Sequence, residues 1–235
     1  MKAALNDKAA SRGRRPQVLA PRRRAPRQSL RDAAYEAIKH RIMTCKFKPG
    51  ECINEASVAE LLGFGRTPVH QALDRLMLED MVDVIPRKGV IVKPVILSDV
   101  LQMVDVRLVN ESYCARLAAE RADDADIKQL DAIASRARKA IVDRNIQAMM
   151  MLDRDFHLTL ARATRNSELA ELVRKLNERS LRFWYISFTT PDHHTSFQEQ
   201  HEAILVDVRN HDADGAAVAM SSHVETFRKS VARQF

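Results

Sequence analysis

The chain has 235 residues, of which 46% are hydrophobic, so it can form one large domain or two modest ones with a packed core. No apolar run reaches the roughly 18 residues of a membrane span, and no apolar segment follows the basic N-terminus. We therefore expect neither a membrane helix nor a secretory signal. The three cysteines, Cys45, Cys52 and Cys114, form no CxxC pair, which is typical of a reduced cytoplasmic protein.

The net charge of +7 is concentrated at one end of the chain. Residues 1–28 hold nine lysines and arginines and one aspartate, whereas the rest of the chain is close to neutral. A basic, proline-containing segment with few apolar residues is typical of disorder. We predict a disordered tail over residues 1–28. It is a solvated leader, the product of a misplaced start codon, or a non-specific DNA-binding arm.

Residues 29–94 have the pattern of a small helical domain that ends in a hairpin. Ser29 is a plausible N-cap for the first helix, and Pro68 suits an early position of the third. Two β-branched runs flank "PRKG", a pattern that predicts a β-hairpin. The expected elements are helices over 30–44, 53–63 and 67–81 and a hairpin over 82–92. Three helices followed by a hairpin predict a winged helix-turn-helix domain.

After Pro94 the sequence has long helical patterns and no strand signal. Clusters of aspartate and asparagine separate most of the expected helices, which lie near 98–121, 124–142, 145–164, 167–189, 195–210 and 212–232. Six amphipathic helices should form an all-α antiparallel bundle over residues 98–232. The predicted fold class is therefore mainly α.

The segment "VAELLGFGRTPVHQALDRLMLEDMV", residues 58–82, predicts a helix, a glycine-containing turn and a DNA-reading helix. Arg66 could contact a guanine through two hydrogen bonds, and Thr67 with the helix N-terminus could hold a phosphate. Lys88 and Gly89 at the hairpin tip suit a wing against the DNA backbone. The alternative for Arg66 is a solvated turn residue.

Four polar residues lie on helical faces that should be buried. Asp153 and His157 share an apolar stripe four residues apart, and His201 and His223 lie on the apolar stripes of the last two helices. Each histidine alone could be an ordinary core histidine. Together, three imidazoles and one carboxylate suit Zn²⁺, Ni²⁺ or a similar divalent ion, and a bound ion would explain why polar groups face the core.

The N-terminal half resembles the DNA-binding domain of the GntR family of bacterial transcription regulators. The resemblance covers "KFKPGECINEASVAELLGFGRTPVHQALDRLMLEDMVDVIPRKGVIV" and is most specific in "RTPV" followed by "ALDRL". It adds Pro68 and His70 to the residues expected to contact DNA. Ala56 and His70 stand where related regulators commonly have arginines, so the operator sequence is expected to differ.

The C-terminal half resembles the FCD domain of the FadR branch of GntR regulators. The matching segments are "LDRDFHLTLARATRNSEL", "EQHEAILVDV" and "AAVAMSSHVETF", which contain Asp153, His157, His201 and His223. The resemblance implies a metal on these four residues, with one or two positions open for a carboxylate effector. Six helices indicate the VanR-like subgroup.

The resemblance also implies that arginines help to bind the effector. Arg107 matches a family position and could pair with the effector's acid. Its alternative is a salt bridge to Glu111 one turn further on. Arg182, Trp184 and Tyr185 could shape the effector pocket, although the two aromatic residues are equally suited to the core or an interface.

We therefore expect a ligand-responsive transcriptional regulator, acting as a repressor, that binds double-stranded operator DNA as a homodimer and senses a small carboxylate. Two other classes stay open. A metal-dependent hydrolase would need a general acid or base, but the sequence has no HExxH arrangement, nucleophile elbow or phosphate-binding glycine loop. An architectural DNA-binding protein with a structural metal would bind DNA identically with and without metabolites.

Overall fold

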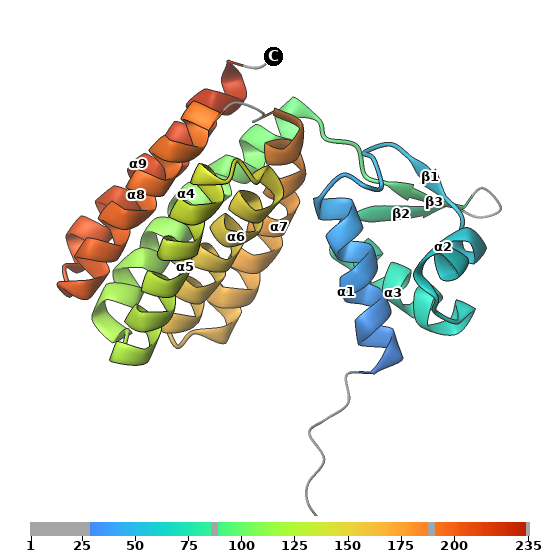
Figure 1. Cartoon of the computed structure of the whole chain (residues 1–235), viewed down its shortest axis with the longest axis horizontal. Coiled ribbons are helices and arrows are strands. Elements are labelled where there is room, and N and C mark those ends of the chain that lie inside the picture. Colours follow the sequence, from blue (N-terminus) through green and yellow to red (C-terminus); the bar gives the residue numbers. More distant parts are fainter. Residues whose placement is uncertain (1–28, 86–88, 188–190, 234–235) are drawn as a thin grey trace, which may run out of the picture.

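Two lobes connected by residues 93–96 make up the computed structural model, which describes residues 29–85, 89–187 and 191–233 (Figure 1). The described part of the N-terminal lobe has three helices and a small sheet, and that of the C-terminal lobe is helical throughout. This confirms the predicted mainly helical fold class. No helix in the described ranges is long and apolar enough to cross a membrane.

Local sequence signals determine where the N-terminal helices begin and end. The side chains of Ser29 and Asn54 accept hydrogen bonds from backbone N–H groups at the starts of the first two helices. Gly63 ends the second helix with φ at 69°, a left-handed conformation that suits glycine. Pro68 lies in the first turn of the third, where its missing N–H would have no intrahelical acceptor. The helices are α1 (Leu30–Met43), α2 (Glu55–Leu62) and α3 (Arg66–Leu78).

The sheet has one strand more than the predicted hairpin. Strands β2 (Val82–Ile85) and β3 (Gly89–Val92) form the hairpin, and β1 (Cys52–Ile53) pairs with the other edge of β3 in antiparallel orientation. The prediction that Ile53 begins the second helix is therefore wrong. Ile53 pairs with Val90 across the sheet, and Asn54 caps the helix instead.

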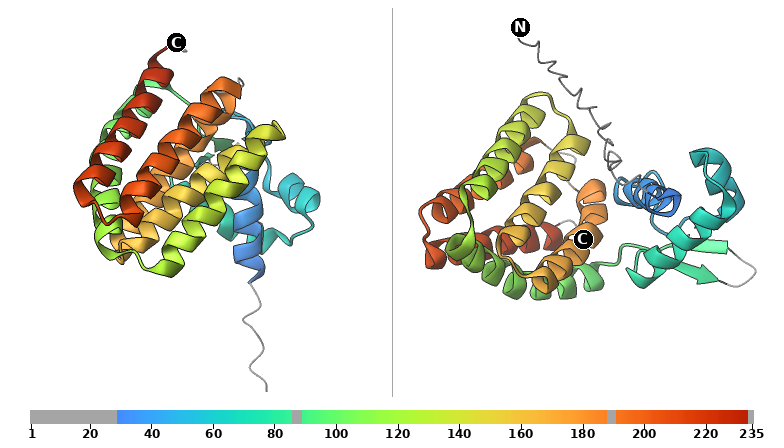
Figure 2. Two further views of the ribbon diagram at one scale, coloured as in Figure 1. Left: turned by 60° about the vertical axis from the view of Figure 1, so that its left-hand side comes forward. Right: turned by 90° about the horizontal axis from the view of Figure 1, so that it is seen from below.

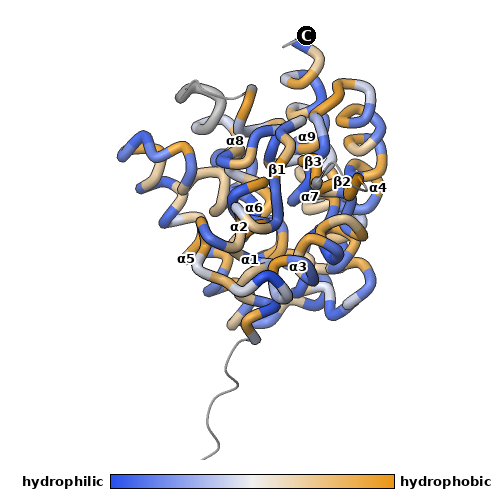
Figure 3. The backbone as a smooth tube through the Cα atoms, turned by 90° about the vertical axis from the view of Figure 1, so that its right-hand side faces the viewer, coloured by the Kyte–Doolittle hydropathy of each residue, from blue (hydrophilic) through white to orange (hydrophobic). Residues whose placement is uncertain are grey.

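The C-terminal lobe is an antiparallel bundle whose described helices match the six predicted ones within a few residues (Figure 2). α8 differs most, because it begins at Pro191 rather than near residue 195. Hydrophobic and hydrophilic residues alternate along each helix in Figure 3, as amphipathic helices around a shared core require. The helices are α4 (Leu97–Arg121), α5 (Asp124–Val142), α6 (Ile146–Ala163), α7 (Ser167–Ser187), α8 (Pro191–Arg209) and α9 (Ala213–Ala232).

Charged side chains are buried where the two lobes meet. Lys39 on α1 forms an ion pair with Glu178 on α7, and these residues are 1% and 0% exposed. Glu178 also pairs with Arg154 on α6 and with Arg174 on α7. One carboxylate therefore holds three cations that come from both lobes.

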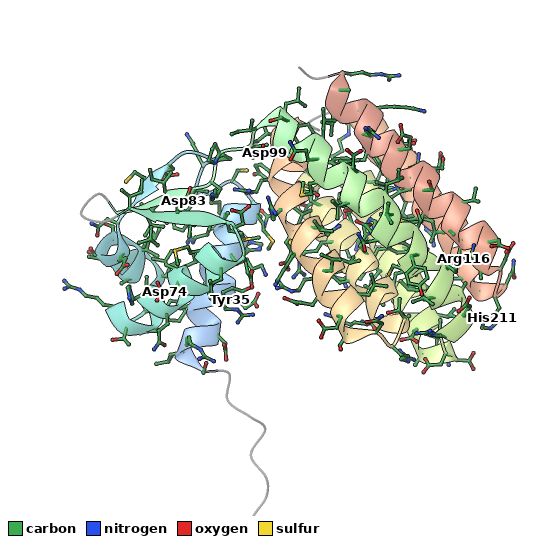
Figure 4. All side chains as sticks on the ribbon, turned by 180° about the vertical axis from the view of Figure 1, so that it is seen from behind. Tyr35, Asp74, Asp83, Asp99, Arg116 and His211 are labelled. Atoms are coloured by element: carbon green, nitrogen blue, oxygen red, sulfur yellow. The ribbon has the colours of Figure 1, made fainter. Side chains whose placement is uncertain are left out.

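A second carboxylate completes this group. Glu79, at the end of α3, accepts a hydrogen bond from the Tyr35 hydroxyl at 2.7 Å and lies 3.2 Å from both Lys39 Nζ and Arg174 Nη2. Burial opposes its ionisation, but the Tyr35 hydrogen bond and the two cations hold the pKa of Glu79 below its ordinary value. Figure 4 labels Tyr35 on the side of the N-terminal lobe that faces the bundle. We call this group the interdomain cluster: Tyr35, Lys39, Glu79, Arg154, Arg174 and Glu178.

The interdomain cluster should make Glu178 essential for stability. Glu178→Gln keeps the shape of the side chain but leaves buried cations without their counter-charge, which typically costs about 3–5 kcal/mol of unfolding free energy. Urea unfolding followed by circular dichroism and by the fluorescence of Trp184, the only tryptophan, measures this change.

Glu171→Gln is the matched control. It removes another carboxylate that pairs with Arg174, but Glu171 is 49% exposed and its loss should cost less than about 1 kcal/mol. Equal urea midpoints for the two variants would show that the buried charges do not stabilise the junction.

Candidate metal centre and DNA-binding surface

The four predicted metal ligands converge inside the bundle, although they come from three helices. α6 supplies Asp153 and His157, α8 supplies His201, and α9 supplies His223. The three histidines are 1–3% exposed, and the four ligand atoms all lie within 4.8 Å of one another. The regular 3.6-residue turn places Asp153 and His157 on one face, and packing of α8 on α9 brings the other two histidines to it.

The distances between ligand atoms fit a divalent ion. His223 Nε2 lies 3.3 Å from both His157 Nε2 and His201 Nε2. Asp153 Oδ1 lies 3.4 Å from His201 Nε2 and 3.9 Å from His157 Nε2. Ligands about 2.1 Å from one ion are separated by about 3.0–4.2 Å in tetrahedral or octahedral geometry. These four distances lie in that range and all pairs lie within 4.8 Å, so the four residues could hold a metal after small side-chain shifts.

The hydrogen bonds of two histidines leave their Nε2 atoms facing each other. His157 Nδ1 lies 2.7 Å from Glu111 Oε2, and His223 Nδ1 lies 3.0 Å from Gln200 Oε1. Both oxygens accept hydrogen bonds, so both Nδ1 atoms carry the proton and both Nε2 atoms are bare in the neutral imidazoles. The two Nε2 atoms lie 3.3 Å apart. A metal ion that replaces any proton between them could accept both lone pairs.

The protonation states also suit metal binding. Burial lowers the pKa of His201 and of His223 well below the ordinary histidine value, and neighbouring cations add to the effect. Both imidazoles are therefore neutral near pH 7, as a ligand must be. Burial raises the pKa of Asp153, whose carboxylate would gain most from a nearby cation.

Glu111 and Gln200 support the ligands from outside, and the sequence did not identify them as part of the site. Burial opposes ionisation of Glu111, but Arg107 and His157 hold its pKa far below the ordinary range. Such outer acceptors fix the orientation of metal-binding imidazoles. The Arg107–Glu111 spacing was visible in the sequence, but the contact between Glu111 on α4 and His157 on α6 depends on tertiary packing.

The structure places both candidate effector arginines away from the cavity beside the ligands. Arg107 Nε donates to Glu111 Oε1 at 2.5 Å and Arg107 Nη1 to Ser180 Oγ at 3.1 Å, so the alternative salt bridge is present. Arg182 Nη1 donates to the carbonyl oxygen of Lys93 at 2.7 Å, at the junction of the lobes. A direct contact of either arginine with an effector stays a prediction.

The cavity beside the metal ligands is small and mainly apolar. Its volume is about 30 Å³, room for one or two water molecules, and Asp153 and His201 form part of its wall. Trp184 also lines the cavity, which agrees with the expectation that it shapes the pocket. Tyr185 is half-buried against the core, which agrees with the alternative. The other lining residues are Ala137, Ile141, Met149, Met150, Leu181, Phe197 and Gln198.

The predicted DNA-contacting residues lie at the start of α3 and the hairpin. Arg66, Thr67 and His70 are exposed on α3, and Pro68 is half-buried. Gly89 begins β3 with φ at 106° and lines a groove with Arg66 between α2, α3 and the hairpin. Lys88 lies outside the described residues.

His70 has two acidic neighbours that were not predicted. Its Nδ1 lies 3.0 Å from Glu55 Oε1, and its Nε2 lies 3.6 Å from Asp74 Oδ2 (Asp74 is labelled in Figure 4). The hydrogen bond with Glu55 and the charge of Asp74 raise the pKa of His70 above its ordinary value. His70 therefore keeps its proton to a higher pH than a free histidine does.

Comparisons with known proteins match both halves of the chain. Residues 30–92 match the family of bacterial regulatory proteins called the gntR family, and residues 102–226 match the FCD domain. The Nta operon transcriptional regulator of Aminobacter aminovorans is 32% identical over 134 residues, which are 57% of this chain and 63% of that regulator. The HTH-type transcriptional repressor RspR of Escherichia coli (strain K12) is 24% identical over 206 residues, covering 88% and 90% of the two chains.

Solved structures share the fold over nearly the whole chain. McbR/YncC of E. coli matches with a TM-score of 0.80 at 21% identity, over 88% of this chain and 99% of that one. A putative GntR regulator from Rhodococcus sp. RHA1 matches with a TM-score of 0.74 at 17% identity, over 87% and 98%. None of these comparisons names the VanR-like subgroup, which stays a prediction. With its N-terminal DNA-binding lobe and its helical C-terminal lobe, the chain belongs to the GntR family of bacterial transcriptional regulators and carries an FCD domain.

Proposed function

We propose that this regulator is a ligand-responsive repressor whose C-terminal lobe holds a divalent metal and senses a small organic acid. The convergence of three buried imidazoles and one carboxylate beside a cavity supports this proposal. Asp153, His157, His201 and His223 would hold the ion, with Zn²⁺ or Ni²⁺ best suited to the ligand set. When bound, the ion would supply a Lewis-acid position for a carboxylate oxygen.

The cavity lining favours an acid with an apolar body. Met149, Met150, Trp184 and Phe197 contribute apolar walls, and Gln198 is the polar residue among the described lining residues that is not a candidate metal ligand. Methionine side chains adapt their shape readily, which would let the cavity enlarge around a ligand. We infer that a small aliphatic or aromatic monocarboxylate fits better than a sugar acid or a tricarboxylate.

A hydrolase is less well supported than a sensor. Glu111 is the carboxylate next to the cluster, and it is engaged on both oxygens, by Arg107 at Oε1 and by His157 at Oε2. Asp153 is itself part of the ligand set. Among the described residues at the site, no carboxylate is therefore left to act as a general base for a metal-activated water.

Operator binding would use α3 and the hairpin of two chains. A single small helix reads few base pairs, so a homodimer on a palindromic operator is the usual solution. Exposed Arg66 and Thr67 at the first turn of α3 are placed for base and phosphate contacts. The repressor name of RspR agrees with this sign of regulation.

The metal proposal predicts one divalent ion per chain. Elemental analysis of protein purified without an affinity tag should find it, and adding Zn²⁺ or Ni²⁺ to chelator-treated protein should raise its melting temperature, because the ion binds the folded state. His157→Ala should lose both effects. His40→Ala, a half-buried histidine on α1, is the matched control and should keep them. A wild-type protein that binds no divalent ion would refute the proposal.

The outer acceptor Gln200 gives a graded test of the same site. Gln200→Leu removes the oxygen that fixes the His223 ring, and loss of such a partner typically weakens metal binding about 10–100-fold. A competition titration with a coloured chelator measures the affinity. Gln102→Leu, an exposed glutamine on α4, should leave it unchanged. Unchanged affinity in Gln200→Leu would mean that His223 does not bind the ion through Nε2.

The DNA proposal predicts that Arg66→Ala abolishes sequence-specific operator binding. Arg209→Ala, an exposed arginine on α8, should bind normally. Deleting residues 1–26 should only weaken binding and flatten its dependence on salt concentration, because fewer counterions are released. Operator titrations at several salt concentrations measure both effects. An Arg66→Ala protein with wild-type operator affinity would show that the reading helix is misplaced.

The effector proposal predicts that an apolar monocarboxylate changes operator affinity by roughly 5–150-fold. The test titrates operator binding against benzoate and valerate, with succinate, citrate and gluconate as polar counterparts. The effect should disappear in metal-free His201→Ala. A response to citrate or gluconate alone would contradict the apolar assignment, and an undiminished response in His201→Ala would remove the metal from sensing.

A further inference from the structure

A second cavity lies at the junction of the lobes, apart from the metal centre. Its volume is about 80 Å³, and it shares no lining residue with the cavity beside the metal ligands. Asp99, labelled in Figure 4 at the start of α4, marks its position. Its wall combines both lobes and their connection: Asp80, Lys93, Pro94, Val95, Ile96, Asp99, Val100, Met103, Arg179 and Arg182.

Arg182 in this wall is a buried cation without a counter-ion among the described residues. It is 5% exposed, its Nη1 donates to the Lys93 carbonyl oxygen, and its Nε is buried with no hydrogen-bond acceptor. Burial and the neighbouring Arg179 lower the pKa of Arg182, and the smaller opposing effects of Cys45 and Asp80 do not cancel this shift. Burying an unpaired guanidinium is costly, and this cost is relieved when an anion binds.

The two aspartates of the cavity wall form their salt bridges and hydrogen bonds with residues other than Arg182. Asp80 lies 2.7 Å from Arg179 Nη2 and 3.2 Å from Lys93 Nζ, so its salt bridges go to those two residues and it offsets the charge of Arg182 only from a distance. Asp99 is exposed and accepts a hydrogen bond from Ser98 at 3.3 Å. Arg182 is thus the group whose charge an incoming ligand would neutralise.

We propose that the junction cavity binds a small oxyanion, such as a carboxylate, sulfate or phosphate group, on Arg182 with Arg179 beside it. Arg179 and Arg182 bring two guanidinium groups to one cavity wall, and guanidinium N–H donors match the oxygens of such a group. The anion would contact α7 of the bundle and the connection at Lys93, so its binding would stiffen the junction between the lobes. This site does not depend on the metal.

The test titrates inorganic sulfate, inorganic phosphate and acetate into the full-length protein, both as purified and after chelator treatment and dialysis. Calorimetry and melting temperature are compared with sodium chloride at equal ionic strength. A site gives saturable binding, whereas general exclusion of sulfate from the surface stabilises without saturation. Comparing the affinity for acetate with those for sulfate and phosphate shows whether the site prefers a planar carboxylate or a tetrahedral anion.

Arg182→Gln should weaken the saturable binding at least about tenfold, because it removes a charge-assisted hydrogen-bond donor. Arg179→Gln, a change of a residue that is 32% exposed, should also weaken it and serves if Arg182→Gln does not fold. Arg209→Gln, which breaks a similar arginine–aspartate pair on α8, should bind as wild type does. No saturable binding of any of the three anions to the wild type would overturn the proposal. So would equal binding by wild type and both junction variants.

Discussion

Burial of charge is the constraint on which this structure depends, because a buried ion or lone pair needs a partner of opposite sign. At the junction of the lobes, Glu178 meets this need with Lys39, Arg154 and Arg174. In the bundle, the Nε2 atoms of three buried histidines face one another beside Asp153 in an arrangement that a divalent cation would fit. At the junction, Arg182 is a buried cation without a counter-ion among the described residues, so a bound anion would stabilise it. The charge of Glu178 is compensated within the chain, whereas the histidine cluster and Arg182 point to ligands.

The interdomain cluster, the histidine cluster and Arg182 are connected through α6 and α7. Asp153 belongs to the candidate metal ligands, while the next residue, Arg154, pairs with Glu178 in the interdomain cluster. On the other side, His157 contacts Glu111, Glu111 binds Arg107, and Arg107 donates to Ser180 on α7, two residues from both Glu178 and Arg182. A ligand that shifts either helix would therefore act on the ion pairs that seat the DNA-binding lobe. Double-mutant cycles between residues of these contacts measure how strongly they are coupled.

The DNA-binding surface has a charge arrangement of its own. Arg66 is exposed at the start of α3, one turn before His70, which two carboxylates surround. Glu55 and Asp74 offset the charge of His70, so this part of the helix attracts phosphate less than an arginine at the same position would. Recognition at His70 would then depend on hydrogen bonding to a base more than on charge.

The sequence by itself determined the helices, because helical periodicity is a local property, and the i, i+4 spacing placed Asp153 and His157 on one buried face. It also predicted that Arg66 lies at the start of an exposed helix, since caps and glycine turns are read from neighbouring residues. It missed β1, a strand of two residues that exists only through pairing with β3. Only the tertiary structure decided between the alternatives for Arg107, joined His157 to Glu111, and placed Arg182 at the junction. Those outcomes depend on which distant side chains packing brings within a few ångströms, and no local pattern records that choice.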